Sequence, residues 1–153
     1  MKCPFCRNEA TEVYNSRPTS HGGRIWRRRR CLACHEAFTT YEFTDLGFLK
    51  VVKKDGAKQR YSRAKLYSGI YGAYLSIPQK EITVDAVTDT VEAALLDTKL
   101  RVIPTADIAA VVLTELKKGY MPAFLRFLAY HVRPSNETEL NQALRRYAGK
   151  KVD

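Results

Sequence analysis

The sequence predicts an α+β protein in two parts, a small β unit followed by a β-hairpin and a helical bundle. All four cysteines lie within the first 34 residues, in two Cys-x-x-Cys pairs. Near residues 45–47 this Cys- and Arg-rich sequence gives way to ordinary alternation of apolar and polar residues. From residue 62 onward, apolar residues recur at the three- and four-residue spacing of amphipathic helices.

These changes in composition predict where the domains begin and end. We expect a first domain at residues 1–46, a second at 47–137, and a C-terminal helix or tail at 138–153. The first 46 residues hold few aliphatic side chains, so this part needs a metal ion to hold a shape.

The two cysteine pairs are typical of a zinc ribbon. Cys3 and Cys6 form one pair, and Cys31 and Cys34 form the other. Four thiolates complete a tetrahedral Zn²⁺ site and leave no open position, so we expect a single structural zinc ion. Buried or paired cysteines without a metal are the alternative, and His21 and His35 are further candidate ligands.

The residue after each pair is predicted to have an unusual backbone. Arg7 and His35 stand where such turns often need φ > 0, a conformation that histidine tolerates better than most residues. Short strands are expected at Thr11–Ser16, Arg24–Arg27 and Ala37–Phe43, because β-branched and aromatic residues alternate there.

Six arginines and no carboxylate occur between Arg17 and Arg30, and the net charge of the chain is +10. This charge favours an acidic partner, and arginine forks suit both phosphate oxygens and guanine edges. A solvated charged face or a nuclear import signal is the alternative. The candidate DNA-binding residues are Arg17, Arg24, Trp26, Arg27, Arg28, Arg29 and Arg30.

Strand geometry divides this set of residues. Alternation along a strand would place Arg27 and Arg29 on the face opposite to Arg28 and Arg30. Trp26 is expected to fill the small ribbon core, with stacking on a base as the alternative.

Residues 47–61 are predicted to form a β-hairpin. One strand runs over Phe48–Lys54, the Asp55-Gly56 dipeptide makes the turn, and residues 57–61 return. Basic side chains cluster at its tip, where they either face water or clamp phosphates. These are Lys53, Lys54, Lys58 and Arg60.

Four or five helices are expected after the hairpin, with start and stop signals along the sequence. Ser62, Thr83, Thr105 and Ser135 are the expected N-caps, Pro122 lies in the first turn of the fourth helix, and Pro78, Gly119 and Pro134 mark ends. The expected core stripes are Leu66, Ile70, Tyr71, Tyr74 and Ile77; Val84, Val87, Val91, Ala94 and Leu95; Ile108, Val111, Val112 and Leu116; Phe124, Leu125, Leu128 and Val132; and Leu140, Ala143, Leu144 and Tyr147.

No catalytic group of residues emerges, so we do not expect an enzyme. The carboxylates are scattered singly, His131 lies among apolar residues, and zinc would occupy every cysteine. No stretch approaches 18 apolar residues, and the amino terminus lacks the apolar segment of a signal peptide. We therefore expect a cytoplasmic protein that does not cross a membrane, in a compartment where C-x-x-C pairs favour metal over disulfide.

The order of these motifs resembles the NrdR-type repressors, which are bacterial regulators of ribonucleotide reductase genes. The first part resembles their zinc ribbon at Cys3–Cys6, Asn15–Arg17, Ile25–Cys34 and Phe38–Glu42. The second part resembles their nucleotide-sensing module, the ATP-cone, at Val51–Gly56, Lys65–Leu66, Ile103–Ile108 and Phe124–Arg133.

The resemblance implies a zinc-dependent repressor that binds double-stranded promoter DNA and associates with the nucleoid when bound. It also implies that ATP and dATP bind the cone as allosteric effectors and change the state of a homo-oligomer. Carried over by position, the nucleotide site comprises Val51, Val52, Lys53, Lys54, Arg60, Lys65, Thr105 and Tyr130, with the phosphates at the three lysines.

Two other functions compete with this interpretation. One is an RNA-binding or ribosome-associated zinc-ribbon protein without nucleotide sensing, and the other is a nucleotide-processing enzyme. The missing catalytic residues argue against the second.

Overall fold

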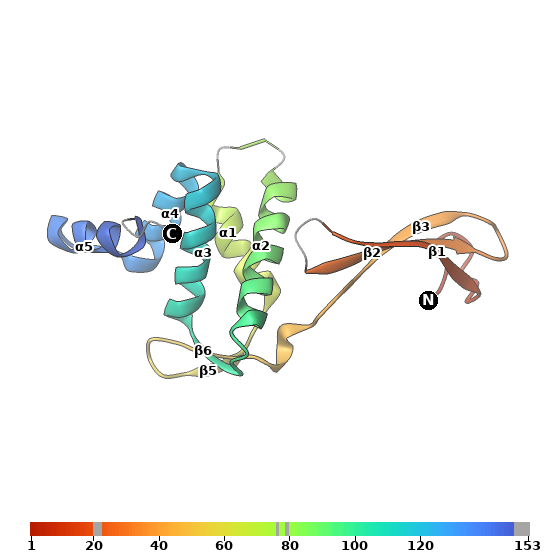
Figure 1. The fold of residues 1–153 in the computed structure, drawn as a ribbon, viewed down its shortest axis with the longest axis horizontal. Helices are drawn as coiled ribbons and strands as arrows, with labels where there is room; N and C mark the ends of the chain where they lie inside the picture. Colours follow the sequence, from red (N-terminus) through yellow and green to blue (C-terminus); the bar gives the residue numbers. More distant parts are fainter. Residues whose placement is uncertain (20–22, 76, 79, 149–153) are drawn as a thin grey trace. The chain divides into compact units, whose positions relative to one another are not determined.

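The computed structural model describes residues 1–19, 23–75, 77–78 and 80–148 (Figure 1). The chain divides into two compact units, Met1–Asp45 and Leu46–Asp153. His21, considered above as a metal ligand, and residues 149–153 of the expected C-terminal tail lie outside the described residues.

The first unit is built on an antiparallel sheet with the strand order β1-β2-β3. The strands are β1 (Thr11–Pro18), β2 (Arg24–Cys31) and β3 (Ala37–Phe43). β2 is longer than expected because it continues through the whole arginine run as far as Cys31. The pairing of β1 with β2 shifts by one residue between Val13 and Asn15, which leaves Tyr14 as the extra residue of a β-bulge.

A very small core closes one face of this sheet. Cys3, Cys31 and Phe38 are buried together, with Cys34 packed against them. Trp26 is only half-buried and lies outside this cluster, so its expected place in the core was wrong. Phe38 pairs with Arg29, whereas Trp26 is an odd number of residues from Arg29 and points to the other face.

The second unit contains a small mixed sheet with the order β5-β4-β6. β4 (Lys50–Val52) pairs antiparallel with β5 (Lys58–Arg60) and parallel with β6 (Val102–Pro104). The expected first strand of the hairpin was too long at both ends. Phe48 belongs to the 3-10 helix η1 (Leu46–Phe48), and the chain leaves β4 before Lys53. Strand β6 was not expected at all.

Five helices complete this unit: α1 (Arg63–Ala73), α2 (Lys80–Asp97), α3 (Thr105–Gly119), α4 (Met121–Val132) and α5 (Glu137–Ala148). Figure 1 shows α1 to α4 side by side with the small sheet at one end, and α5 extending away from them. The four helices share one apolar core, whose fully buried members include Ile70, Val91, Leu113 and Phe124.

Several helix boundaries differ from the expected ones. Ser62 is the N-cap of α1, as expected, but α1 ends at Ala73, well before Pro78. Thr83 lies inside α2. Thr105 is the first residue of α3 rather than its cap, because its hydroxyl group is used elsewhere, as described below.

The last two helices also depart from expectation. Asn136 replaces Ser135 as the side-chain cap of α5, because its Oδ1 accepts the backbone N–H of Glu139 at 2.9 Å. Leu125 and Leu140 were assigned to the core but are 47% and 39% exposed. On α4 the buried position belongs instead to Phe127.

Candidate metal centre, nucleotide cavity and nucleic-acid surface

The four cysteines form one cluster in the first unit. Their Sγ atoms all lie within 4.8 Å of one another, with Cys3 to Cys34 at 3.7 Å and Cys6 to Cys31 at 3.5 Å. A tetrahedron with Zn–S bonds of about 2.3 Å has S–S edges of about 3.8 Å. The geometry and the donor set therefore fit a structural zinc ion. Within the described residues, His35 is not part of the cluster.

Two matching turns present these thiols. Arg7 and His35 have φ values of 65° and 61°, so the left-handed conformation expected after each pair is confirmed. The backbone N–H groups of Phe5 and Ala33 each donate to the first cysteine of their turn at 3.4 Å.

The hydrogen bonds around Cys31 favour the thiolate form of its side chain. The backbone N–H of Cys34 is the largest influence, and with that of Ala33 it lowers the pKa of the Cys31 thiol to about 6, although burial acts in the opposite direction. A lowered thiol pKa favours the ionised form that binds metal.

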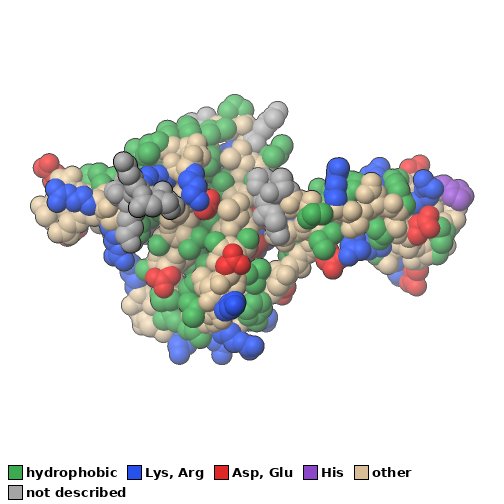
Figure 2. Space-filling model, viewed as in Figure 1, with side chains coloured by type: hydrophobic (Ala, Val, Ile, Leu, Met, Phe, Trp, Pro, Cys, Tyr) green, Lys and Arg blue, Asp and Glu red, His purple; other side chains and the backbone are tan. Residues whose placement is uncertain are grey.

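A cavity of about 460 Å³ opens in the second unit, between the small sheet and helices α1, α3 and α4. This volume is in the range of small-molecule sites. Four basic side chains line it, those of Lys53, Lys54, Arg60 and Lys65. Its lining also includes the apolar residues Val51, Leu66, Ile108, Ala109, Val112 and Phe127. Figure 2 shows lysine and arginine side chains gathered at the edge of this unit where Figure 1 places β5 and β6.

Two contacts orient the basic side chains. Lys65 donates from Nζ to Gln59 Oε1 at 2.8 Å, and Arg60 donates from Nε to the carbonyl oxygen of Gly47 at 3.0 Å. The turn that carries Lys53 and Lys54 closes as the Asp55-Gly56 pair predicts. Gly56 has φ +82°, and Lys53 N–H donates to Ala57 at 2.9 Å.

Six of the eight residues expected at the nucleotide site line this cavity: Val51, Lys53, Lys54, Arg60, Lys65 and Thr105. Val52 does not line it and contributes a backbone carbonyl, which accepts a hydrogen bond from Thr105. Tyr130 is 65% exposed and lines an adjoining cavity of about 830 Å³ instead.

His131 is one of the lining residues that sequence reasoning did not place at this site. It lines both cavities, and its ring lies 4.1 Å from that of Phe127 between centroids. Burial, followed by the nearby charges of Lys54 and Arg133, lowers the pKa of His131. Its place four residues after Phe127, on the same helix face, was the signal that could have identified it.

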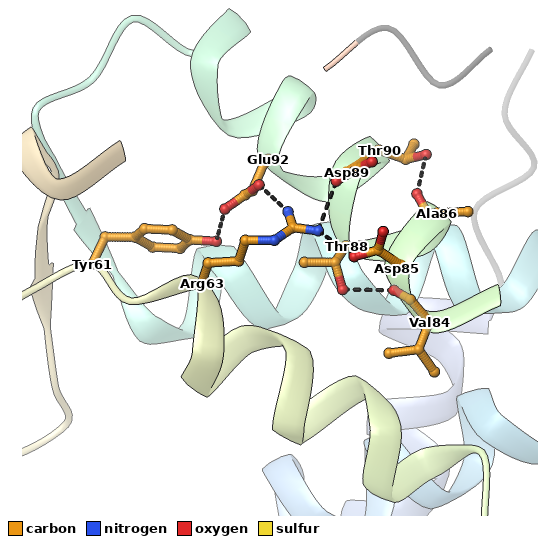
Figure 3. Close-up of polar contacts among 9 residues, drawn as sticks. All are labelled: Tyr61, Arg63, Val84, Asp85, Ala86, Thr88, Asp89, Thr90 and Glu92. Carbon is orange, nitrogen blue, oxygen red and sulfur yellow. Dashed lines mark hydrogen bonds and ion pairs between the residues drawn. The ribbon is translucent and has the colours of Figure 1, made fainter. Parts of the chain in front are cut away.

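A partly buried ionic cluster lies next to Tyr61, one of the residues that line the cavity (Figure 3). Arg63 at the start of α1 makes ion pairs with Asp85 at 2.7 Å, with Asp89 at 2.7 Å and with Glu92. Tyr61, which lines the cavity, donates its hydroxyl hydrogen bond to Glu92 Oε1 at 2.8 Å. The expectation that carboxylates are scattered singly was therefore wrong, because three of them lie on one face of α2.

Burial and charge act on these groups together. Burial, and then the carboxylate of Glu92, raise the pKa of the Tyr61 hydroxyl, so it stays a hydrogen-bond donor. Burial alone would lower the pKa of Arg63, but the facing carboxylates, Glu92 foremost, raise it on balance. The cluster thus fixes the cavity wall to α2.

The arginines of β2 lie on two faces of the ribbon sheet, as alternation predicts. Arg28 and Arg30 both contact Tyr14. Arg28 donates from Nε to the Tyr14 hydroxyl at 3.3 Å, and the Arg30 guanidinium carbon lies 5.0 Å from the centroid of the Tyr14 ring. Arg27 contacts Glu42 and Arg29 contacts Thr40 on the opposite face. Arg17 and Arg24 join the Arg28 face, where their guanidinium groups lie over Trp26 and Phe43.

Comparison with known proteins assigns each unit to a family model. Residues 1–42 match the model described as "Transcriptional repressor NrdR-like, N-terminal domain", and residues 49–131 match the "ATP cone domain". Within the described part of the chain, every helix is too short or too polar to cross a membrane.

Curated relatives match over most of the chain. The transcriptional repressor NrdR of Albidiferax ferrireducens is 39% identical over 131 residues, which is 86% of this chain and 88% of the relative. The transcriptional repressor NrdR of Bordetella petrii is 38% identical over 149 residues, covering 97% of this chain and 94% of the relative. That of Verminephrobacter eiseniae is 38% identical over 131 residues, or 86% and 88% of the two chains.

Proposed function

We propose the function of this chain from one premise: it belongs to the NrdR family of transcriptional repressors. It is a nucleotide-sensing repressor and not an enzyme. In our proposal residues 1–46 bind double-stranded promoter DNA of ribonucleotide reductase genes, and the DNA-contacting side chains come from the candidate set Arg17, Arg24, Trp26 and Arg27–Arg30. Residues 47–137 bind ATP or dATP, and residues 138–153 form a C-terminal helix and tail. The protein acts in the cytoplasm, on the nucleoid when it is bound to DNA.

The cavity of the second unit carries this proposal. Its basic part suits the phosphates of a nucleotide, with Lys53, Lys54 and Lys65 as charge partners. Its apolar part, formed by residues such as Ile108 and Phe127, suits a purine ring. A cavity lined by both basic and apolar side chains suits an adenine nucleotide, which carries charged phosphates and an apolar ring.

The zinc ion has a supporting role in this mechanism. Cys3, Cys6, Cys31 and Cys34 would hold it, and when bound it supplies the folding energy that the small core of the ribbon lacks. The sheet then holds the arginines at fixed positions, because β2 ends at Cys31.

Regulation requires that ATP and dATP favour different assemblies, because a ligand that binds two states equally well does not shift the equilibrium between them. We propose that the two nucleotides change how copies of the chain associate. One ribbon reads only a short segment of DNA, so operator recognition needs two or more ribbons at a fixed spacing. Each tenfold preference of a nucleotide for one assembly corresponds to about 1.4 kcal/mol.

Mass measurement in solution tests this proposal. The zinc-loaded chain is examined alone, with ATP, with dATP and with both, each with and without promoter duplex. We expect at least two distinct masses among the nucleotide states, and DNA binding in only some of them. One constant mass, with DNA binding indifferent to nucleotide, contradicts the regulatory mechanism.

Calorimetry tests the cavity itself. Lys53→Met and Lys65→Met are each expected to weaken ATP and dATP binding at least tenfold, because each removes a phosphate partner. Lys118→Met is the matched control, since Lys118 lines neither cavity and pairs with Glu115 at 2.8 Å. Flat titrations of the unaltered chain with both nucleotides would instead favour an RNA-binding or ribosome-associated ribbon protein.

A further inference from the structure

The two faces of the ribbon sheet differ in what their arginines touch. Residues directly opposite one another on paired strands project to the same face. Arg17 is opposite Trp26, and Arg24 is opposite Phe43, so these pairs share a face. Arg28 and Arg30 lie on that face as well, because they are two and four residues from Trp26. We define the arginine–aromatic face as Arg17, Arg24, Arg28 and Arg30 with Tyr14, Trp26, Tyr41 and Phe43.

Aromatic rings support the guanidinium groups of this face. The guanidinium carbon of Arg17 lies 4.6 Å from the Trp26 ring centroid, that of Arg30 lies 5.0 Å from Tyr14, and that of Arg24 lies 5.9 Å from Phe43. Arg28 is held by hydrogen bonds to the Tyr14 hydroxyl at 3.3 Å and to Thr39 Oγ1 at 3.0 Å. A guanidinium stacked on a ring, as in Arg17 and Arg30, can present the N–H groups at its edge to an acceptor, and it has lost part of its rotamer freedom in advance.

The opposite face uses its arginines within the ribbon. Arg27 makes an ion pair with Glu42 at 2.6 Å, and its side chain is only 30% exposed. Arg29 donates from Nε to Thr40 Oγ1 at 3.1 Å. Phe38, opposite Arg29, is buried against the cysteine cluster on this side. The ion pair with Glu42 places a carboxylate against the Arg27 guanidinium, which makes this group less available to a phosphate.

We infer that the ribbon contacts duplex DNA through the arginine–aromatic face alone, and that Arg27 and Arg29 hold the sheet together. This inference rests on the proposed DNA-binding function and assigns it to one surface. From Arg24 to Arg30 the strand rises roughly 20 Å, which matches about six base pairs. The rings of Trp26, Tyr14 and Phe43 already carry guanidinium groups, so unpaired bases would have to displace arginines in order to stack.

Two double variants separate the faces. Arg28→Ala with Arg30→Ala changes the arginine–aromatic face, and Arg27→Ala with Arg29→Ala changes the other. Each lowers the net charge of +10 by two, so long-range attraction falls equally in both. The zinc-loaded full chains are titrated against a fluorescent random-sequence duplex of about 30 base pairs and against its single strand, at about 50–200 mM salt.

In the Arg28/Arg30 variant we expect the slope of log affinity against log salt concentration to become shallower by about 1.8, or about 0.9 for each lost phosphate contact. We also expect its affinity for the duplex to fall about 60-fold at about 0.1 M salt. The Arg27/Arg29 variant is expected to stay within about threefold of the unaltered chain. Zinc content and circular dichroism check that each variant folds. If an alanine pair misfolds, the corresponding lysine pairs are compared, and the pair at positions 28 and 30 is again expected to bind more weakly.

Equal losses in the two variants, or a larger loss for the Arg27/Arg29 variant, would overturn the face assignment while leaving DNA binding intact. An unaltered chain that does not bind the duplex would instead refute the proposed function. The unaltered chain could bind the single strand more tightly than the duplex, and the Arg28→Ala/Arg30→Ala variant could weaken that single-strand binding. This result would refute duplex DNA as the partner of this face.

Discussion

The hydroxyl group of Thr105, the first residue of α3, donates a hydrogen bond of 3.0 Å to the backbone carbonyl oxygen of Val52. These residues are 53 positions apart in the chain. Val52 is the last residue of β4, directly before Lys53 and Lys54. The bond therefore attaches the start of a helix to the point at which the lysine-bearing turn leaves the sheet.

Replacing Thr105 with valine tests the role of this bond. Thr105→Val keeps the shape of the side chain but removes the donor, so we expect a loss of about 1 kcal/mol in the free energy of unfolding. We also expect weaker nucleotide binding in calorimetry, because the lysine turn loses an attachment. Thr105→Ser, which keeps the hydroxyl group, is the control and should retain most of the affinity.

Removing one cysteine should unfold only the ribbon. Cys31→Ser deletes a buried candidate zinc ligand, and structural zinc supplies on the order of 10–16 kcal/mol in small peptides. We expect loss of bound zinc by metal analysis and loss of DNA binding. The second unit has its own core, so its thermal transition should persist. A full zinc content in this variant would refute the assignment of Cys31 as a ligand.

The ionic cluster predicts a stability change that depends on pH. Arg63→Met leaves Asp85, Asp89 and Glu92 without their shared cation, which should cost about 3–5 kcal/mol at neutral pH. Like charges left together raise carboxyl pKa values in the folded state. The folded variant then binds protons more readily than the unfolded chain, so its deficit should shrink as the pH falls toward about 4–5. Urea unfolding at several pH values measures this; a deficit independent of pH argues against the mechanism.

His131 predicts a pH effect of the opposite sign. Its pKa is lowered in the folded state by burial and by Lys54 and Arg133, so the unfolded chain binds the proton more tightly. Stability should therefore fall as the pH drops below about 6.5, the ordinary value for histidine. The slope of melting temperature against pH between about 7.5 and 5.5 should be smaller in His131→Asn than in the unaltered chain. Equal slopes would show that His131 does not carry the effect.

Features that depend on short stretches of sequence could be predicted well. The cysteine spacing identified the metal cluster, and the strand period sorted Arg27 from Arg28 correctly, because both follow from local backbone geometry. The Asp55-Gly56 turn was found for the same reason. Family resemblance added Val51, Lys65 and Thr105 to the basic residues that the hairpin pattern had already placed together at the cavity.

Features set by contacts between distant segments were missed. Strand β6 has three residues, too few for a visible period, and exists because it pairs with β4. The three carboxylates of α2 are visible in the sequence, but their convergence on Arg63 requires the packing of α2 against α1. Trp26 was expected in the core, whereas the strand register places it under Arg17.

The parallel pairing of β4 with β6 also determines the order in which the two units can mature on the ribosome. The three strands and four cysteines of the ribbon all lie within residues 1–43. Once these residues have left the ribosome, a nascent chain can bind zinc and fold this unit. The central strand β4 gains β5 almost at once, but it has to wait about 50 residues for its second partner, β6. Until residues 102–105 leave the exit tunnel, the lysine turn lacks both β6 and the Thr105 bond. A growing chain is thus able to hold metal well before it is able to sense a nucleotide.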